Sequence, residues 1–177
     1  MSLTTSSVAL LLLASLAPAM ENLILNADFS QRWSDWMAAP AVKDQKATLV
    51  SEADNTFLRL NPGCQVQGEV QIPLDPSWTR ITVSGRIRVA GLVVAEDIAY
   101  GDARFAHSFV LADGKRQYAP VLHQRVDTGP EGAAAWKTLT KTVKIPAGAL
   151  RLEIACAHFG TAGVVDFDDL QATPITD

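Results

Sequence analysis

Three neighbouring side chains, Tyr100, Asp102 and Arg104, could together bind a sugar. They supply an aromatic plane, an acceptor carboxylate and a forked guanidinium donor, which suit the apolar face and the hydroxyls of a sugar ring. All three lie in or beside residues 91–104, a segment that interrupts a strand-like pattern, and binding residues often lie on such loops. The alternative is an ordinary solvated loop in which Asp102 and Arg104 pair on the surface, contributing well under about 1 kcal/mol.

A second candidate surface consists of polar side chains that alternate with apolar ones along residues 64–72 and 80–89. Glutamines, including Gln67, occupy the polar positions of the first segment, and arginines, including Arg86 and Arg88, occupy those of the second. Amide and guanidinium groups are planar hydrogen-bonding partners for hydroxyls, so these three side chains are candidate ligand contacts. The alternative is a solvated sheet surface without a ligand.

Acidic residues near the two ends of the chain could hold a metal ion. Residues 22–29 form a short apolar run that ends in Asn and Asp, and residues 163–170 are rich in Asp. If these segments pair as first and last strands, hard oxygen atoms meet there, and calcium binds six to eight of them. The alternative is a pair of solvated turns.

Catalytic chemistry has no positive support in the sequence. The chain has no Gly-x-Ser-x-Gly elbow, no His-Glu-x-x-His and no Cys-x-x-Cys, the patterns that mark common hydrolase and zinc sites. Its three histidines are isolated, and His107 lies in phase with Phe105 and Phe109, which favours a buried core position. We therefore expect a protein that is not an enzyme.

Length and charge point to one ordinary globular domain. The chain has 177 residues and a net charge of −4, a size that suits a single domain with its own core. Lysines and arginines are scattered along the chain, and only Lys115 and Arg116 are adjacent, so the basic patch of a nucleic-acid-binding protein is missing.

The first twenty residues have the pattern of a cleaved signal peptide. Residues 8–16 are apolar but too short to cross a bilayer as a helix, and Ala17-Pro18-Ala19 follows them as a small-x-small cleavage site. We therefore expect residues 1–20 to be removed, residues 21–177 to form one domain, and the protein to be secreted or periplasmic, without a membrane span.

The two cysteines allow two interpretations. An oxidising compartment would permit a bridge between Cys64 and Cys156, which would close a long loop and stabilise the fold by up to about 4 kcal/mol. Alternatively, both are buried free thiols that pack as small hydrophobic side chains.

Hydrophobic periodicity after residue 21 is two almost throughout, as in half-buried strands. In residues 80–89, for example, Ile81, Val83, Ile87 and Val89 fall on one face. Turn signals such as Asp113-Gly114 separate these segments. About ten short strands favour an all-β fold, a two-sheet antiparallel sandwich or barrel, with negligible helix. The expected strands are residues 22–25, 46–50, 56–60, 64–72, 80–89, 103–112, 117–123, 137–145, 150–156 and 164–172.

Four segments, in order, resemble a known family. The start, NLILNADFS at 22–30 followed by Trp, and the end, VDFDDLQATP at 165–174, are similar to the galactose-binding-domain-like jelly rolls, in particular to carbohydrate-binding modules of bacterial glycoside hydrolases. DNTFLRL at 54–60 and Trp136 with VKIPAGA at 143–149 resemble two intervening segments of that family. The resemblance covers nearly all of the chain after residue 20.

The resemblance implies a β-sandwich of the jelly-roll type that binds oligosaccharide or polysaccharide, performs no catalysis, acts beside a glycoside hydrolase and is a monomer. It also implies a structural calcium ion near the N-terminus. The family's ligand positions correspond here to Asp28 and Asn55, both through their carbonyls, and to Ser30, Glu52 and Asp168. Because Ser30 replaces a glutamate of the family, the ligand charge is lower and we expect a weaker site.

A second interpretation assumes the same fold but a different binding partner. The same sandwich could be a secreted adhesion or protein-interaction domain with no glycan ligand, since a fold does not decide a function. A polar cleft with an aromatic side chain would favour a glycan, whereas a flat apolar patch would favour a protein.

Overall fold

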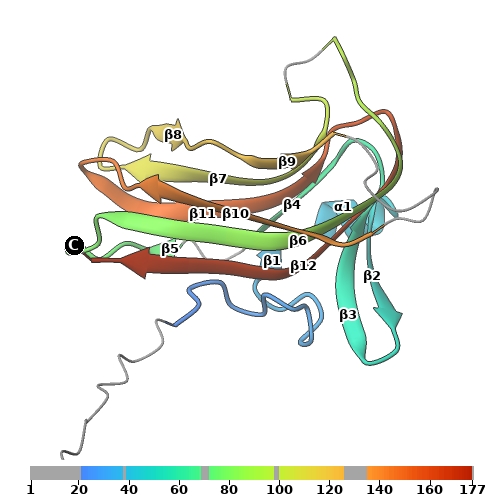
Figure 1. The fold of residues 1–177 in the computed structure, drawn as a ribbon, viewed down its shortest axis with the longest axis horizontal. Coiled ribbons are helices and arrows are strands. Elements are labelled where there is room, and N and C mark those ends of the chain that lie inside the picture. The colour runs from blue at the N-terminus through green and yellow to red at the C-terminus, as the bar shows by residue number, and fades with distance from the viewer. Residues whose placement is uncertain (1–20, 38, 69–71, 98–99, 126–134, 177) are drawn as a thin grey trace, which may run out of the picture.

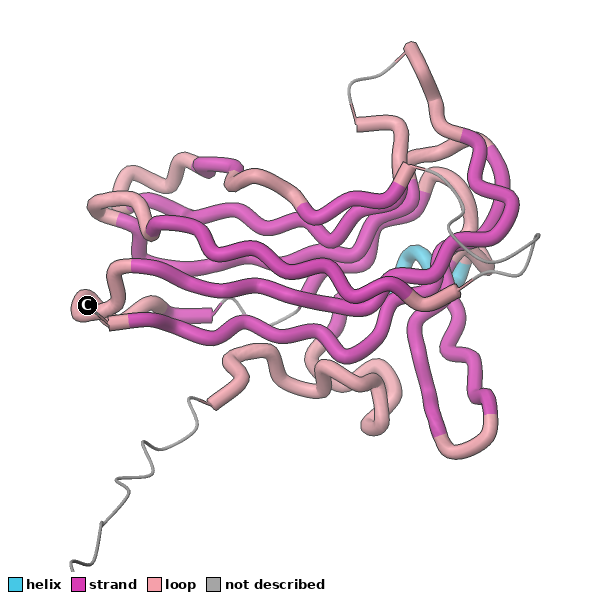
Figure 2. Tube along the Cα trace, in the orientation of Figure 1, coloured by secondary structure: helices cyan, strands magenta, loops and turns pink. Residues whose placement is uncertain are grey.

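The computed structural model describes residues 21–176 except 38, 69–71, 98–99 and 126–134. The expected signal peptide therefore lies outside the described residues. Two antiparallel sheets run along the length of the molecule and pack against each other (Figures 1 and 2). The predicted all-β sandwich is confirmed.

One sheet has seven strands and the other five. The seven-stranded sheet follows the order β1 (Trp36–Met37), β4 (Cys64–Gly68), β11 (Ala149–His158), β7 (Ala103–Leu111) and β8 (Arg116–Tyr118), with β5 (Ile72–Pro73) on β11 and β9 (Leu122–Gln124) on β7. The five-stranded sheet follows the order β10 (Lys137–Lys144), β6 (Arg80–Val93), β12 (Ala162–Ile175), β3 (Asn55–Leu60) and β2 (Ala47–Glu52). The described residues include one short helix, α1 (Ala39–Lys43), and no helix long and apolar enough to cross a membrane.

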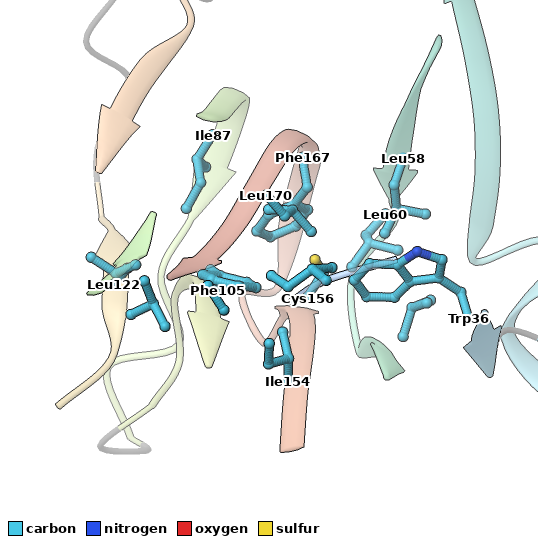
Figure 3. Close-up of a cluster of buried hydrophobic side chains, with 14 of the residues drawn as sticks. Trp36, Leu58, Leu60, Ile87, Phe105, Leu122, Ile154, Cys156, Phe167 and Leu170 are labelled. Atoms are coloured by element: carbon cyan, nitrogen blue, oxygen red, sulfur yellow. The ribbon is translucent and has the colours of Figure 1, made fainter. Parts of the chain in front are cut away.

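The core lies between the two sheets, where the apolar faces of both meet. Along β6, the predicted inward set Ile81, Val83, Ile87 and Val89 is almost completely buried, as the period of two requires. Figure 3 shows side chains of both sheets in one cluster, among them Phe105 of β7 and others from β6, β12 and β3. The outward-pointing residues of each sheet are therefore left to form two separate surfaces.

A bulge in β12 sets the register of its acidic residues. The pairing with β6 shifts between Asp168 and Gln171, and Asp169 takes a positive φ of 48°. This extra residue lets Phe167 and Leu170 both point inward although they are three positions apart. Leu170 packs against Gly85, where an added Cβ would lie 2.6 Å from its side chain.

The N-terminal strand prediction, residues 22–25, is wrong. These residues form bends and turns, although Leu23 N still donates to Ala172 O at 2.9 Å. The side chain of Asn22 makes the hydrogen bonds to β12 that a paired strand would make, because its Nδ2 donates to Leu170 O and its Oδ1 accepts from Ala172 N. A side-chain amide mimics one peptide unit, so the segment is attached to β12 without a ladder.

The cysteines are two buried free thiols, the second of the two interpretations. Cys64 and Cys156 lie on the neighbouring strands β4 and β11, where Cys64 is opposite His158 and Cys156 is opposite Val66. Burial raises the pKa of both thiols, which makes them poor nucleophiles.

Candidate functional site

A groove of about 670 Å³ lies on the outer face of the seven-stranded sheet. Its floor is made of small side chains, Ala106 and Ser108 on β7 and Ala155 on β11, and larger side chains stand around them. These larger residues are Gln65, Tyr100, Arg104, Arg116, Tyr118, Val121, Glu153 and Phe159.

The strand register explains why these residues share one face. Ser108 lies opposite Tyr118 of β8 on one side and opposite Glu153 of β11 on the other. Ala106 lies opposite Ala155. Directly opposed residues of antiparallel strands point the same way, so a strip of outward side chains crosses the strands beside a floor of small ones. The small floor is what makes this face hollow.

An aromatic and cationic cluster stands at one end of the groove. The rings of Tyr100 and Phe159 meet edge to face at 5.4 Å between centroids. The guanidinium carbon of Arg104 lies 5.8 Å from the first ring and 5.9 Å from the second. Tyr100 is half exposed, at 51 %, so its ring is available to a ligand. Two of the three side chains first considered for sugar binding thus line the groove.

Asp102 supports the groove from below and does not line it. Its carboxylate is buried, and Oδ1 accepts from both Nε and Nη2 of Arg104, at 2.7 and 2.6 Å. Oδ2 has no hydrogen-bond partner, with His123 Nδ1 at 3.7 Å and Arg125 Nη1 at 3.8 Å. Asp102 therefore fixes Arg104, and a ligand would meet the arginine. The two residues do pair, as the alternative interpretation had it, but the pair is buried.

An ion pair and a second tyrosine stand at the other end. Arg116 donates from Nε and Nη2 to the two carboxylate oxygens of Glu153, at 2.6 and 3.2 Å. The Glu153 side chain is only 5 % exposed, whereas Arg116 is half exposed. Tyr118 is 76 % exposed, the highest fraction among the large apolar and aromatic side chains described. The groove therefore presents an aromatic plane and hydrogen-bonding groups near each end.

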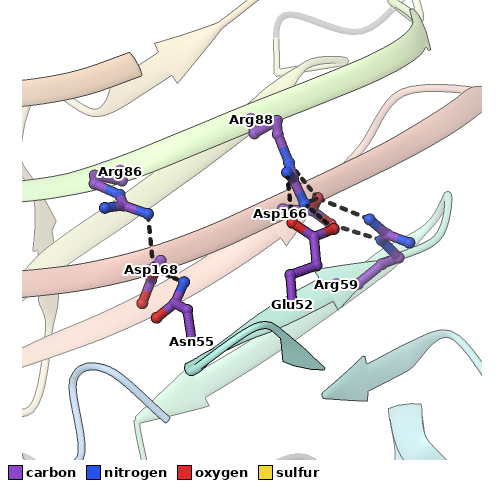
Figure 4. Close-up of polar contacts among 7 residues, drawn as sticks. All are labelled: Glu52, Asn55, Arg59, Arg86, Arg88, Asp166 and Asp168. Atoms are coloured by element: carbon purple, nitrogen blue, oxygen red, sulfur yellow. Dashed lines mark hydrogen bonds and ion pairs between the residues drawn. The ribbon is translucent and has the colours of Figure 1, made fainter. Parts of the chain in front are cut away.

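The arginines predicted from β6 lie elsewhere. Arg86 and Arg88 point outward from the five-stranded sheet, so they do not join Tyr100 and Arg104 in one site. They form a network with acidic residues of β12 (Figure 4). Gln67 belongs to the groove sheet, where its backbone lies opposite Ala155, but its side chain lies outside the described part of the chain.

The arginine network of the five-stranded sheet is closed. Asp166, 2 % exposed, accepts from both Arg59 and Arg88 at 2.7 to 2.9 Å. Arg88 also donates to both carboxylate oxygens of Glu52 at 3.0 Å, which lowers the pKa of that carboxyl. The guanidinium of Arg88 lies 4.7 Å from the ring centroids of both Phe57 and Trp136. These groups satisfy one another and leave little for a ligand.

The residues that correspond to the family's calcium ligands are engaged with other partners. Asp28 accepts from the backbone N and the Oγ of Ser30, at 3.1 and 2.9 Å, which lowers its pKa. Asn55 Nδ2 donates to Asp168 Oδ2 at 2.8 Å, and Arg86 Nη2 donates to the same oxygen at 3.1 Å. Burial raises the pKa of Asp168.

As they lie, the carboxylates of Glu52 and Asp168 are engaged by Arg88 and by Asn55 and Arg86. Asn55 and Asp28 were expected to bind through their carbonyl oxygens, which these side-chain contacts do not occupy. Glu52 would have to leave Arg88 to bind an ion. Among the described residues, no three or more His, Cys, Asp or Glu side chains are grouped so that they could hold a metal. A calcium ion near the N-terminus stays a prediction of the resemblance.

Sequence reasoning did not select the ion pair of Arg116 and Glu153, or Tyr118 and Phe159. The alternation in 150–156 did place Glu153 on the polar face of its strand. Arg116 and Tyr118 likewise share one phase, two positions apart. What was missing is the pairing of β7 with both β8 and β11, which brings residues 37 positions apart into contact.

No protein-family model and no curated protein matches the sequence. Solved structures do match. A family 16 carbohydrate-binding module superposes with a TM-score of 0.60 at 14 % identity, over 86 % of this chain and 99 % of that one. A structure titled "CBM4 structure and function" gives 0.50 at 17 % identity, over 86 % and 99 %. An enzymatically active domain of a bacteriophage CBA120 tailspike gives 0.58 at 13 % identity, but only 21 % of that chain is covered.

These likenesses establish the fold. The chain has the jelly-roll β-sandwich fold of carbohydrate-binding modules, which confirms the fold that the four sequence segments implied. Two of the matched structures are covered almost from end to end, so the similarity extends over a whole module.

Proposed function

We propose that this protein is a secreted, non-catalytic carbohydrate-binding domain that holds an oligosaccharide or polysaccharide in the groove of the seven-stranded sheet. The observation that carries the proposal is the groove itself: a floor of small side chains between Tyr100 at one end and Tyr118 at the other. A sugar ring has an apolar face that stacks on an aromatic plane, and hydroxyls that need planar hydrogen-bonding partners.

The charges in the groove support a ligand rich in hydroxyls. Arg104 is paired with Asp102, and Arg116 with Glu153, so each guanidinium is neutralised and held in place. A guanidinium fixed by a carboxylate keeps N–H groups that can donate to hydroxyls without losing rotamer freedom on binding. The groove is therefore preorganised for a ligand that accepts hydrogen bonds.

The fold supports the wider role. Full-length neighbours include TmCBM61 in complex with β-1,4-galactotriose, with a TM-score of 0.50 at 12 % identity over 88 % of this chain and 99 % of that one. We propose that this chain likewise binds a glycan and that, as the sequence resemblance implies, it acts beside a glycoside hydrolase. We also propose that it acts as a monomer after removal of residues 1–20.

The test is binding to a panel of insoluble and soluble glucans, xylans, mannans and galactans, by pull-down and by titration calorimetry. We expect Tyr118→Ala to weaken binding by about 1–2 kcal/mol, roughly tenfold, because an exposed aromatic plane is lost. The melting temperature should stay nearly unchanged, since the ring is 76 % exposed.

Leu150→Ala is the matched control. Leu150 is a large exposed side chain, at 54 %, on β11 but outside the groove, so binding should be unchanged. Retention on no member of the panel would contradict the proposal and favour a protein-interaction domain.

A further inference from the structure

A second, smaller hollow lies beside the groove and shares Tyr118 with it. It measures about 240 Å³ and lies between the β8 side of one sheet and β10, the edge strand of the other. Tyr118 lines both the groove and this hollow. A ligand that contacts Tyr118 in the groove therefore lies next to the hollow.

The charged side chains that line this hollow are two lysines, Lys141 and Lys144 of β10. The remaining lining residues are neutral: Phe109, Gln117, Tyr118, Ala119, Pro120, Thr142, Val143 and Pro146. We call this hollow, with its two lysines, the lysine hollow.

The lysines differ from the cations of the groove in lacking a counter-charge. Arg104 and Arg116 each have a carboxylate partner. Lys115, on the neighbouring turn, pairs with Asp113 at 2.7 Å. No carboxylate of the described residues forms an ion pair with Lys141 or Lys144. This local excess of positive charge stands in a chain whose net charge is −4.

The positive charge of Lys141 also affects the buried residue His107. Lys141 contributes, after burial, to lowering the pKa of His107 to about 4. The histidine is therefore neutral at pH 7 and supplies no charge of its own. The two lysines are the cations available to a ligand in this hollow.

Resting on the proposed function, we infer that the lysine hollow is an anion subsite, and that the ligand is an acidic glycan, with a carboxylate or sulfate next to the sugar stacked on Tyr118. Lysine ammonium groups are compact cations that bind such groups at an exposed surface. An unpaired cation beside a stacking platform gains a partner only when the ligand brings the anion. The competing explanation is that these lysines merely protect the edge strand β10 from pairing with another chain.

The experiment compares polysaccharides that share a backbone and differ in charge. The pairs are polygalacturonate with its methyl ester, carboxymethyl cellulose with hydroxyethyl cellulose, and a sulfated galactan with its desulfated form. For the pair whose backbone the groove accepts, we expect the acidic member to bind about fivefold more tightly in low salt, and the preference to fade near 1 M salt. The pair that shows the preference distinguishes carboxylate from sulfate.

The variant is Lys141→Ala/Lys144→Ala, and Lys137→Ala is its control, since Lys137 lies exposed on the same strand but outside the hollow. The double variant should lose the preference for the acidic member and bind the neutral member as before. Equal binding of both members by the unmodified protein, or an equal loss in Lys137→Ala, would overturn the inference and leave the proposed function standing. Binding to no polysaccharide at all would overturn both.

Discussion

The outer faces of the two sheets are built from similar residue types and reach opposite results. On the five-stranded sheet, Arg59, Arg88 and Asp166 interlock with aromatic rings and with one another. On the seven-stranded sheet, Arg104 and Arg116 pair with acids at the two ends of a floor of alanine and serine. The two faces differ in the side chains that stand between the charged residues. Large side chains fill the five-stranded face, whereas small ones leave the seven-stranded face hollow.

Buried polar atoms without hydrogen-bond partners occur on both sides of the sandwich. In the five-stranded sheet, Asp166 accepts hydrogen bonds at both oxygens, but Arg86 Nε has no partner among the described residues. Asp102 Oδ2, beside the seven-stranded sheet, and both ring nitrogens of the buried His107 are also without partners in this part of the chain. Each such group needs a structural or functional explanation, so the two faces are distinguished by their shape and not by these atoms.

The largest effect should come from breaking the closed network. We expect Asp166→Ala to lower the free energy of unfolding by about 3 kcal/mol, because two arginines lose the buried carboxylate between them. Glu52→Ala removes an exposed partner of Arg88 and should have a much smaller effect, because exposed ion pairs contribute little to stability. Urea unfolding measures both. Glycan binding should survive in each variant, and a loss of binding in Asp166→Ala equal to that in Tyr118→Ala would assign a ligand to the five-stranded face.

The next effect concerns the buried histidine beneath the groove. Burial first, and then Lys141, lower the pKa of His107 from 6.5 to about 4. Between these two pH values the unfolded chain therefore binds a proton at His107 that the folded chain does not bind. The free energy of unfolding is therefore unaffected by this histidine above about pH 6.5, and it decreases as the pH falls from 6.5 toward 4.

Between pH 7.5 and pH 5.0 we expect the free energy of unfolding to fall by about 2 kcal/mol through His107. Burial also lowers the pKa of His158, which acts in the same direction. Unfolding in urea at both pH values, for the unmodified protein and for His107→Leu, measures the difference. An equally steep pH dependence in the variant would show that His107 is not the source.

The smallest effect is that of calcium. If the ion binds near the N-terminus as the resemblance predicts, calcium chloride should raise the melting temperature over EDTA by about 2–4 °C or less. The rise should be small because the ion must displace Arg88 from Glu52 and Arg86 from Asp168. Asp168→Ala should abolish the difference. Identical melting in both buffers would contradict the prediction.

The two predicted ligand sets show how far sequence reasoning reaches. Alternation correctly placed Arg86 and Arg88 on the polar face of β6, but this face turned out to be occupied by Asp166 and Asp168 from the strand beside it. Tyr100 and Arg104 were selected from their types and spacing, and both line the groove. The local pattern placed Glu153 on a polar face, but it did not mark Glu153 or Tyr118 as groove residues, because their neighbours in the groove come from other strands.

The sequence by itself determined most of the strands, their inward and outward faces, and the jelly-roll resemblance, although the strand expected at 22–25 does not form and those expected at 64–72 and 117–123 are each divided in two. These properties depend on the period of two and on turn residues, which are local and need no knowledge of partners. Only the tertiary structure decided which outward face is hollow and which is filled. That outcome depends on register, on the bulge at Asp169 that aligns β12, and on which residue lies opposite each arginine. A cation opposite an acid becomes part of the fold, and one left without an acid, as in the lysine hollow, remains available to a ligand.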